Sequence, residues 1–173
     1  MGTGTSSNPN VMNIAGTVQG AGIGTGPYNT GPNVIEFGGN TIVNIKSTGR
    51  IVQTGGANNG ETFNPTGGNN TINNYGSIET TTSSAIWFEG SDTSTAGYGN
   101  TINNYGTIRA GTQGTGTVVG NSGNGRIVFT DNKGAVVKGN IALSTTGSYV
   151  NLVTLYNGST VTGSIGGAGV AQS

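Results

Sequence analysis

Hydrophobic residues occur along this chain in short groups that are separated by glycine, asparagine and threonine. Val34-Ile35, Ile127-Val128-Phe129 and Val136-Val137 are three such groups. β-Branched and aromatic residues in short runs between turn-forming residues favour β-strands. No segment keeps the 3.6-residue apolar spacing of a helix over three turns, and the 35 glycines disfavour helices throughout. The pattern therefore predicts an all-β protein.

A repeat of about thirty residues organises these groups. The phrases TIVN, TINN and TINN begin at residues 41, 71 and 101, and a weaker Gly-x-apolar pattern brings the number of copies to about six. A further apolar segment precedes each phrase, at 34–37, 85–88 and 117–119. Fixed periods of this length are typical of solenoids, in which stacked repeats bury a shared core. We therefore predict one domain, residues 1–173, folded as a parallel β-helix (β-solenoid) of about six three-stranded rungs.

The repeated phrase predicts a local structure for each rung. Side chains alternate along a strand, so Ile102 is expected to point into the core and Asn104 to lie inward where the strand ends. Asn44, Asn74 and Asn104 should then stack on successive rungs as a ladder of amide side chains. Gly76 and Gly106 follow this position and are expected to supply a positive φ at the corner.

Composition removes several classes of function. Only 7% of the residues are charged and the net charge is zero, so no nucleic-acid partner is expected. The chain has no cysteine and no histidine, which excludes thiolate sites and Ser-His or Cys-His catalysis. The sequence therefore predicts no cofactor, no metal and no enzyme activity.

Segments of the form Asn-x-Gly-x-Ile lie at 74–78 and 104–108, and 132–136 ends in valine instead. With these segments and its lack of cysteine, the chain resembles the passenger region of bacterial autotransporters (type V secretion) over roughly residues 10–165. The resemblance implies a right-handed β-helix, which agrees with the usual hand of parallel crossovers. It also implies a surface-exposed or secreted protein of a Gram-negative bacterium, often a virulence-associated adhesin.

The same resemblance implies partners and a larger parent protein. The expected partners are the host-cell surface, an extracellular matrix protein or a glycan, with self-association as a further one. The chain would be a piece of a longer passenger whose outer-membrane barrel lies outside it. Residues 1–8 and 167–173 are rich in small residues and are expected to fray.

Two other functions remain open for a chain of this kind. One is a purely structural stalk. The other is a β-helix that binds or degrades polysaccharide, for which the nearest pair of carboxylates in the sequence is Glu89 and Asp92. We expect these two acids to be ordinary surface residues.

Three aromatic residues are candidates for recognition. Ile86-Trp87-Phe88 aligns with Ile35-Glu36-Phe37, which places Trp87 at the position of a glutamate and so on the outer face. An exposed tryptophan can anchor a partner, although packing under the segment 91–99 is the alternative. Tyr75 and Tyr105 lie thirty residues apart and are expected to stack across two rungs. The long connections 20–32, 55–68 and 91–99 are expected to project from related corners of the rod and to build one binding side.

Overall fold

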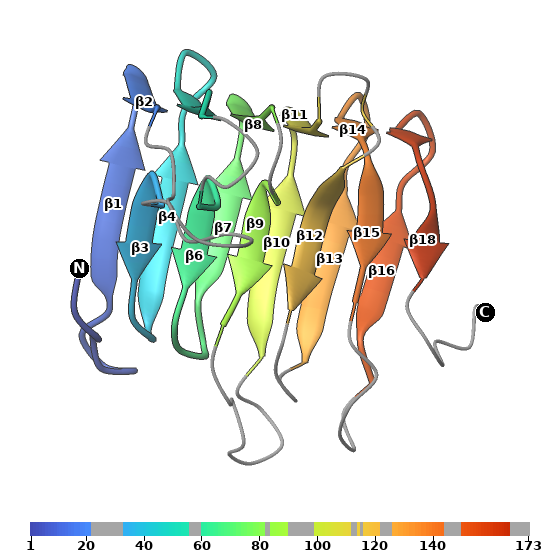
Figure 1. Ribbon diagram of the computed structural model, residues 1–173. Coiled ribbons are helices and arrows are strands. Elements are labelled where there is room, and N and C mark those ends of the chain that lie inside the picture. The colour runs from blue at the N-terminus through green and yellow to red at the C-terminus, as the bar shows by residue number, and fades with distance from the viewer. Residues whose placement is uncertain are drawn as a thin grey trace.

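The computed structural model describes residues 1–21, 33–55, 60–81, 84–89, 99–111, 114, 116–121, 126–143 and 150–166. These residues form a rod of stacked strands, in which the order along the rod follows the order along the chain (Figure 1). The strands make three six-stranded sheets, and every pairing within them is parallel. Consecutive strands of the chain belong to different sheets, so the chain visits each sheet in turn and then begins the next rung. The prediction of an all-β parallel solenoid with three strands per repeat is confirmed, and the right-handed sense stays a prediction.

Sheet 1 begins each rung. Its strands are β1 (Asn10–Ile14), β4 (Thr41–Ile45), β7 (Thr71–Asn74), β10 (Asn100–Asn104), β13 (Ile127–Asp131) and β16 (Leu152–Leu155).

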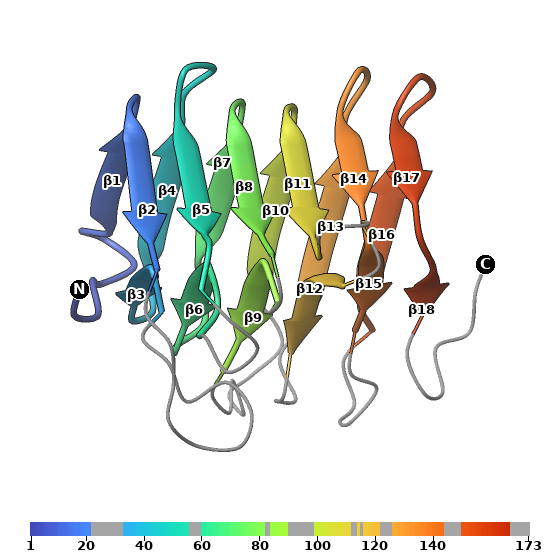
Figure 2. The same ribbon diagram turned by 45° about the horizontal axis from the view of Figure 1, so that its top comes forward.

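Sheet 2 follows and faces the viewer in Figure 2. Its strands are β2 (Thr17–Gly20), β5 (Arg50–Gln53), β8 (Ser77–Thr80), β11 (Thr107–Ala110), β14 (Val136–Lys138) and β17 (Thr160–Thr162).

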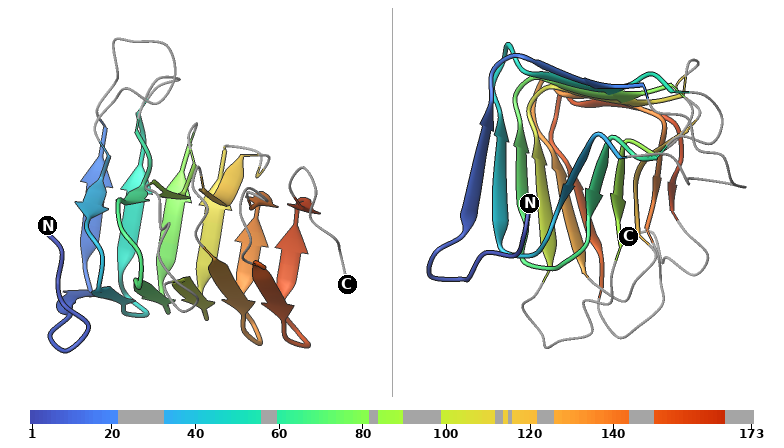
Figure 3. Two further views of the ribbon diagram at one scale, coloured as in Figure 1. Left: turned by 90° about the horizontal axis from the view of Figure 1, so that it is seen from below. Right: turned by 60° about the vertical axis from the view of Figure 1, so that its left-hand side comes forward.

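Sheet 3 completes each rung, and the right-hand view of Figure 3 shows the three sheets around the interior. Its strands are β3 (Ile35–Phe37), β6 (Phe63–Pro65), β9 (Ile86–Phe88), β12 (Thr117–Asn121), β15 (Asn140–Ala142) and β18 (Ile165–Gly166). Strand β6 was missed in the sequence, where 55–68 was assigned to a connection, because Phe63 is its single large apolar residue.

The core consists of apolar side chains stacked in register. On sheet 2 the fully buried column is Ile51, Ile78, Ile108 and Val137, each paired with the next. Sheet 1 contributes Val43, Ile72, Ile102 and Phe129 in the same way. Because strands alternate their side chains, one apolar residue in two is enough to fill this interior, which explains how a chain with 31% hydrophobic residues forms a continuous core.

The predicted ladder of Asn44, Asn74 and Asn104 is wrong in its first member. Asn104 pairs with Asn74, but Asn44 pairs with Asn73, and Ile45 takes the position opposite Asn74. The first phrase is shifted by one residue because Val43 and Ile45 both lie inward and are fully buried. Alignment by letters would have turned these two apolar side chains to the outer face, and a shift of one residue reverses the faces.

The predicted role of Gly76 and Gly106 is also wrong. Neither glycine adopts a φ in the left-handed region. Their backbones instead lie against the previous rung: a Cβ on Gly76 would overlap the carbonyl oxygen of Gly49, and one on Gly106 would overlap that of Gly76. Glycine is required here because there is no room for a side chain.

Candidate binding surfaces

The structure separates the predicted site residues into two places. Trp87 lies on strand β9 of sheet 3, and Glu89 follows directly after the end of that strand. Tyr75 and Tyr105 lie at the corner between sheets 1 and 2, directly after β7 and β10. Asp92 lies outside the described residues, so the predicted pair with Glu89 is not placed. The sequence did not indicate this separation, because all five residues occur within about one repeat of each other.

Trp87 lies on the outer face of sheet 3, as predicted. Its neighbours Ile86 and Phe88 are buried in the core, whereas Trp87 itself is half-buried. Trp87 pairs in register with Gly120 of β12, and a Cβ on Gly120 would lie 2.5 Å from the indole atom Cζ3. The indole therefore covers the bare backbone of Gly120 and still keeps part of its surface exposed.

Acidic residues gather around sheet 3. Glu36 and Glu89 are exposed, and Glu61 is buried just before β6. Burial raises the pKa of the Glu61 carboxyl, and the negative charge of Glu89 adds to this effect. The backbone amide of Glu61 donates a hydrogen bond to Asn33 Oδ1 at 2.8 Å, which holds this segment against the first rung. Glu61 was not singled out in the sequence because it lies in a segment that was assigned to a connection.

Tyr75 and Tyr105 form the stacked pair that the sequence predicted. Their ring centroids are 4.5 Å apart and the ring planes differ by 4°. The amide of Tyr75 donates to the carbonyl of Ile45, and that of Tyr105 to the carbonyl of Asn74, so the two residues hold the same position on consecutive rungs. Because each ring covers one face of the other, those two faces are closed to a sugar or another ligand.

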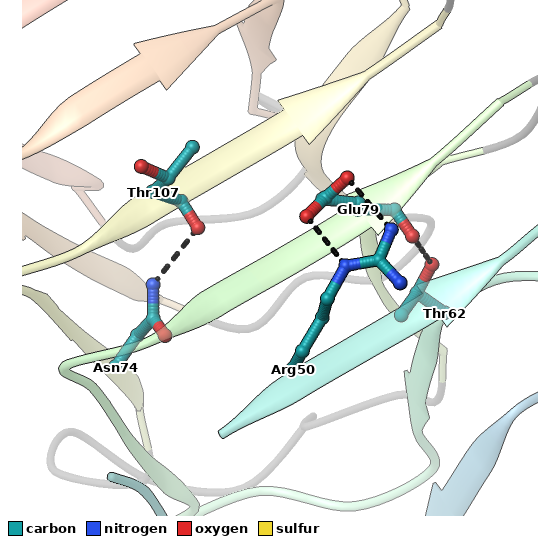
Figure 4. A network of polar contacts seen from close by, with 5 residues as sticks. All are labelled: Arg50, Thr62, Asn74, Glu79 and Thr107. Carbon is teal, nitrogen blue, oxygen red and sulfur yellow. Dashed lines mark hydrogen bonds and ion pairs between the residues drawn. The ribbon is translucent and has the colours of Figure 1, made fainter. Parts of the chain in front are cut away.

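Five of the six basic residues lie on sheet 2 or at its corner with sheet 1. Arg50, Arg109 and Lys138 lie on sheet 2, and Lys46 and Lys133 lie in its turns with sheet 1. Arg50 Nε and Nη2 donate to the two carboxylate oxygens of Glu79 at 3.1 and 3.3 Å (Figure 4). Burial disfavours the charged form of Glu79, but hydrogen bonds from Arg50 and Ser77 and the charges of both arginines keep its pKa below the ordinary value. Sheet 2 therefore has a net positive charge, because Glu79 offsets only one of its three basic residues, whereas Glu36, Glu61 and Glu89 lie on or beside sheet 3.

Asparagine ladders run along the rod beside these surfaces. On the outer face of sheet 1, the side-chain amides of Asn44, Asn73 and Asn103 each donate to the asparagine of the previous rung, beginning at Asn13, over 2.9–3.1 Å. Inside, Asn74 Nδ2 donates to Asn104 Oδ1 at 2.7 Å and also to the carbonyl of Thr107 at 3.1 Å (Figure 4). The outer ladder was missed in the sequence, although the doubled asparagines at 73–74 and 103–104 are its signal.

Asp131 continues the inner ladder and was not predicted to do so. It pairs with Asn104, and its Oδ1 accepts a hydrogen bond from Asn104 Nδ2 at 2.7 Å. Its other carboxylate oxygen, Oδ2, is buried and has no hydrogen-bond partner in the part of the chain that the structure describes. Burial raises the pKa of this carboxyl by more than the hydrogen bond from Asn104 and the nearby hydroxyl of Ser159 lower it.

Comparison with known proteins gives no relative for this chain. No protein-family model, no curated protein and no solved structure matches it. Among the described residues, no group of three or more acidic, cysteine or histidine side chains is placed to hold a metal ion. Within the same residues, no helix has the length and apolarity needed to cross a membrane.

Proposed function

We propose that this chain is a surface-exposed segment of an autotransporter-like passenger and that it acts as an adhesin through the outer face of sheet 3. The fold class and the Asn-x-Gly-x-Ile segments support the type of protein. In these segments the asparagine builds the inner ladder, the glycine admits the neighbouring rung and the isoleucine fills the core. The sequence of the parent gene tests the setting, because an export signal upstream and a membrane anchor downstream are expected.

The observation that carries the adhesive role is the outward position of Trp87. Tryptophan is the residue type most enriched among the dominant contacts of binding surfaces. Here it lies among the acids Glu36 and Glu89, whereas the basic residues lie elsewhere. A surface with an aromatic ring and carboxylate acceptors favours ligands that are uncharged or basic. We therefore expect neutral glycans to bind better than sulfated ones.

The test compares Trp87→Ala with Val136→Ala. Val136 is also an outward, half-buried apolar residue, but it lies on sheet 2. Beads coated with each protein are added to cultured epithelial cells and to arrays of neutral and sulfated glycans. Truncation of a dominant contact costs about 2 kcal/mol or more, which is roughly a thirtyfold loss of binding. We expect this loss for Trp87→Ala alone, at a temperature where circular dichroism shows both variants to be folded.

The stalk and the polysaccharide-degrading protein are separate outcomes of the same experiment. If beads coated with the wild-type protein adhere no better than uncoated beads on any surface, the adhesive role is overturned. The structural stalk is then the favoured function, and the continuous asparagine ladders are consistent with it. Shortened glycans recovered after incubation would favour degradation. The observation behind that second function is the raised pKa of the buried Glu61 carboxyl, which the charge of Glu89 helps to raise, since the general acid of glycoside hydrolysis is a carboxylic acid of raised pKa.

A further inference from the structure

Tyr75 and Tyr105 hold a geometry that stacking alone does not require. Each is the first residue after a strand of sheet 1, and each backbone amide bonds to the rung before it, at 2.8 and 2.7 Å. The rings are almost parallel at 4.5 Å, and the two residues are 50% and 43% exposed. Equivalent ring carbons of the two phenols are therefore held close together while their edges stay open to solvent.

This pair is isolated within its own column of residues. The same corner position is occupied by Lys46 on the rung before and by Asn132 on the rung after, as their backbone hydrogen bonds to Ile14 and Asn104 show. The next tyrosine, Tyr156, follows Asn132 by one further rung and is 54% exposed. Tyr156 thus has the same kind of position and similar exposure, but no tyrosine stands directly beside it in the column.

We propose that Tyr75 and Tyr105 are a site of oxidative cross-linking, at which a dityrosine bond joins two consecutive rungs. Each phenol gives up one electron and one proton and becomes a phenoxyl radical. The two radicals couple through their ortho carbons, and proton shifts restore both phenols, so the protein loses two hydrogen atoms. The oxidant is hydrogen peroxide activated by a haem peroxidase, and it is reduced to two molecules of water.

The fold favours this reaction over the alternatives. Two radicals held in contact couple as an intramolecular step, which is faster than an encounter between chains at low concentration. Both side chains are partly exposed, which leaves space for the rings to rotate until two ortho carbons meet. The chain has no cysteine, and a bond between residues 75 and 105 would close a loop much as a disulfide does.

The experiment removes the three tyrosines that lie outside the described residues. In a Tyr28→Phe, Tyr98→Phe, Tyr149→Phe background, the full chain is treated at low concentration with peroxide and peroxidase. We expect dityrosine fluorescence in the monomer, a mass lower by two hydrogen atoms and a raised melting temperature. Cleavage after glutamate separates Tyr75 from Tyr105 at Glu79, and added cleavage after arginine and lysine separates Tyr105 from Tyr156 at Arg109, so the linked peptides identify the bond.

Matched variants decide the result. The linked product should disappear in Tyr75→Phe and in Tyr105→Phe and remain in Tyr156→Phe. It should also fall at least tenfold when the protein is oxidised in denaturing urea, because the stack is then lost. A folded protein that gives no 75–105 bond would overturn the proposal, and so would equal yields in the folded and unfolded states.

Discussion

Asp131 interrupts the inner asparagine ladder with a carboxylate. Two rungs place an asparagine at this inner corner, Asn74 and Asn104, and the third places a carboxylate there. An amide can accept from one rung and donate to the next, whereas an ionised carboxylate only accepts. The buried Oδ2 of Asp131 has no hydrogen-bond partner among the described residues, and a buried polar atom without one costs stability.

We expect Asp131→Asn to raise the free energy of unfolding at neutral pH by about 1–3 kcal/mol, the typical penalty of an unsatisfied buried polar group. Urea denaturation at pH 7 measures this difference. Glu36→Gln is the control, because it removes one negative charge from an exposed position. A variant no more stable than the wild type would contradict the role given to Asp131.

The same substitution should change how stability depends on pH. The pKa of Asp131 is raised in the folded state, so the folded protein binds the proton more tightly than the unfolded chain. The stability that this group contributes is fully present below its unfolded pKa of about 3.9 and is lost as pH rises through the folded pKa. The advantage of Asp131→Asn should therefore be large at pH 7 and shrink toward pH 3. An advantage of equal size at both pH values would show that the cause is not ionisation.

At the scale of elements, the corner between sheets 1 and 2 is very short on the two rungs that carry the repeated phrase. Only Tyr75 and Gly76 separate β7 from β8, and only Tyr105 and Gly106 separate β10 from β11. The carbonyl of each corner glycine accepts a hydrogen bond from the next rung, as Gly76 does from the amide of Thr107 at 2.9 Å. A short turn and a close stack together leave these positions without space for a methyl group.

Gly106→Ala should lower the free energy of unfolding by about 1–3 kcal/mol, the range for overpacking, because its Cβ would overlap Gly76. Gly16 is the matched control: it lies in the same column on the first rung, and a Cβ there would meet no atom within 4 Å. Gly16→Ala should be neutral or slightly stabilising. Thermal and urea unfolding of the two variants measure the contrast, and equal losses in both would exclude close stacking as the cause.

For the whole molecule, stability is built from contacts between neighbouring rungs. Every strand pairs with strands three places away in the chain order, and no sheet joins distant parts of the rod directly. In such solenoids, stability is approximately a sum over rungs and the interfaces between them. One complete rung can then be removed without loss of the fold, provided that the register across the cut is kept.

Deletion of residues 71–100 makes this change, because it joins Asn70 to Thr101, and Thr101 holds the position of Thr71 on the next rung. We expect a shorter rod with the same circular dichroism spectrum per residue and a smaller urea m-value, since less surface is exposed on unfolding. Deletion of residues 71–85 is the control. It removes β7 and β8 but leaves β9, so sheet 3 keeps a strand whose partners in the same rung of sheets 1 and 2 are missing. If the chain without residues 71–100 folds as poorly as this control, the additive contribution of rungs to stability is contradicted.

Part of the candidate surface followed from the alignment of repeats. The outward side of Trp87 was predictable because its partner in the alignment is Glu36, which would not be buried unpaired. The stack of Tyr75 and Tyr105 followed from identical phrases thirty residues apart. The expectation that 20–32, 55–68 and 91–99 leave from related corners is wrong for the third segment. The first two both begin at or after the end of a strand of sheet 2, whereas 91–99 lies between β9 of sheet 3 and β10 of sheet 1, and most residues of the first and third segments lie outside the described part of the chain.

The sequence by itself determined the period, a repeat of three short strands and the parallel solenoid, although it did not reveal β6. These depend on local alternation and on turn residues, which every copy of the repeat carries. Only the tertiary structure decided the register, which shifts Asn44 by one residue, and the reason for the corner glycines. It also decided that Asp131 completes the inner ladder and that five of the six basic residues lie on sheet 2 or at its corner with sheet 1. Each of these depends on which atoms of one rung lie above those of another, and that contact is fixed by the packing of the shared core.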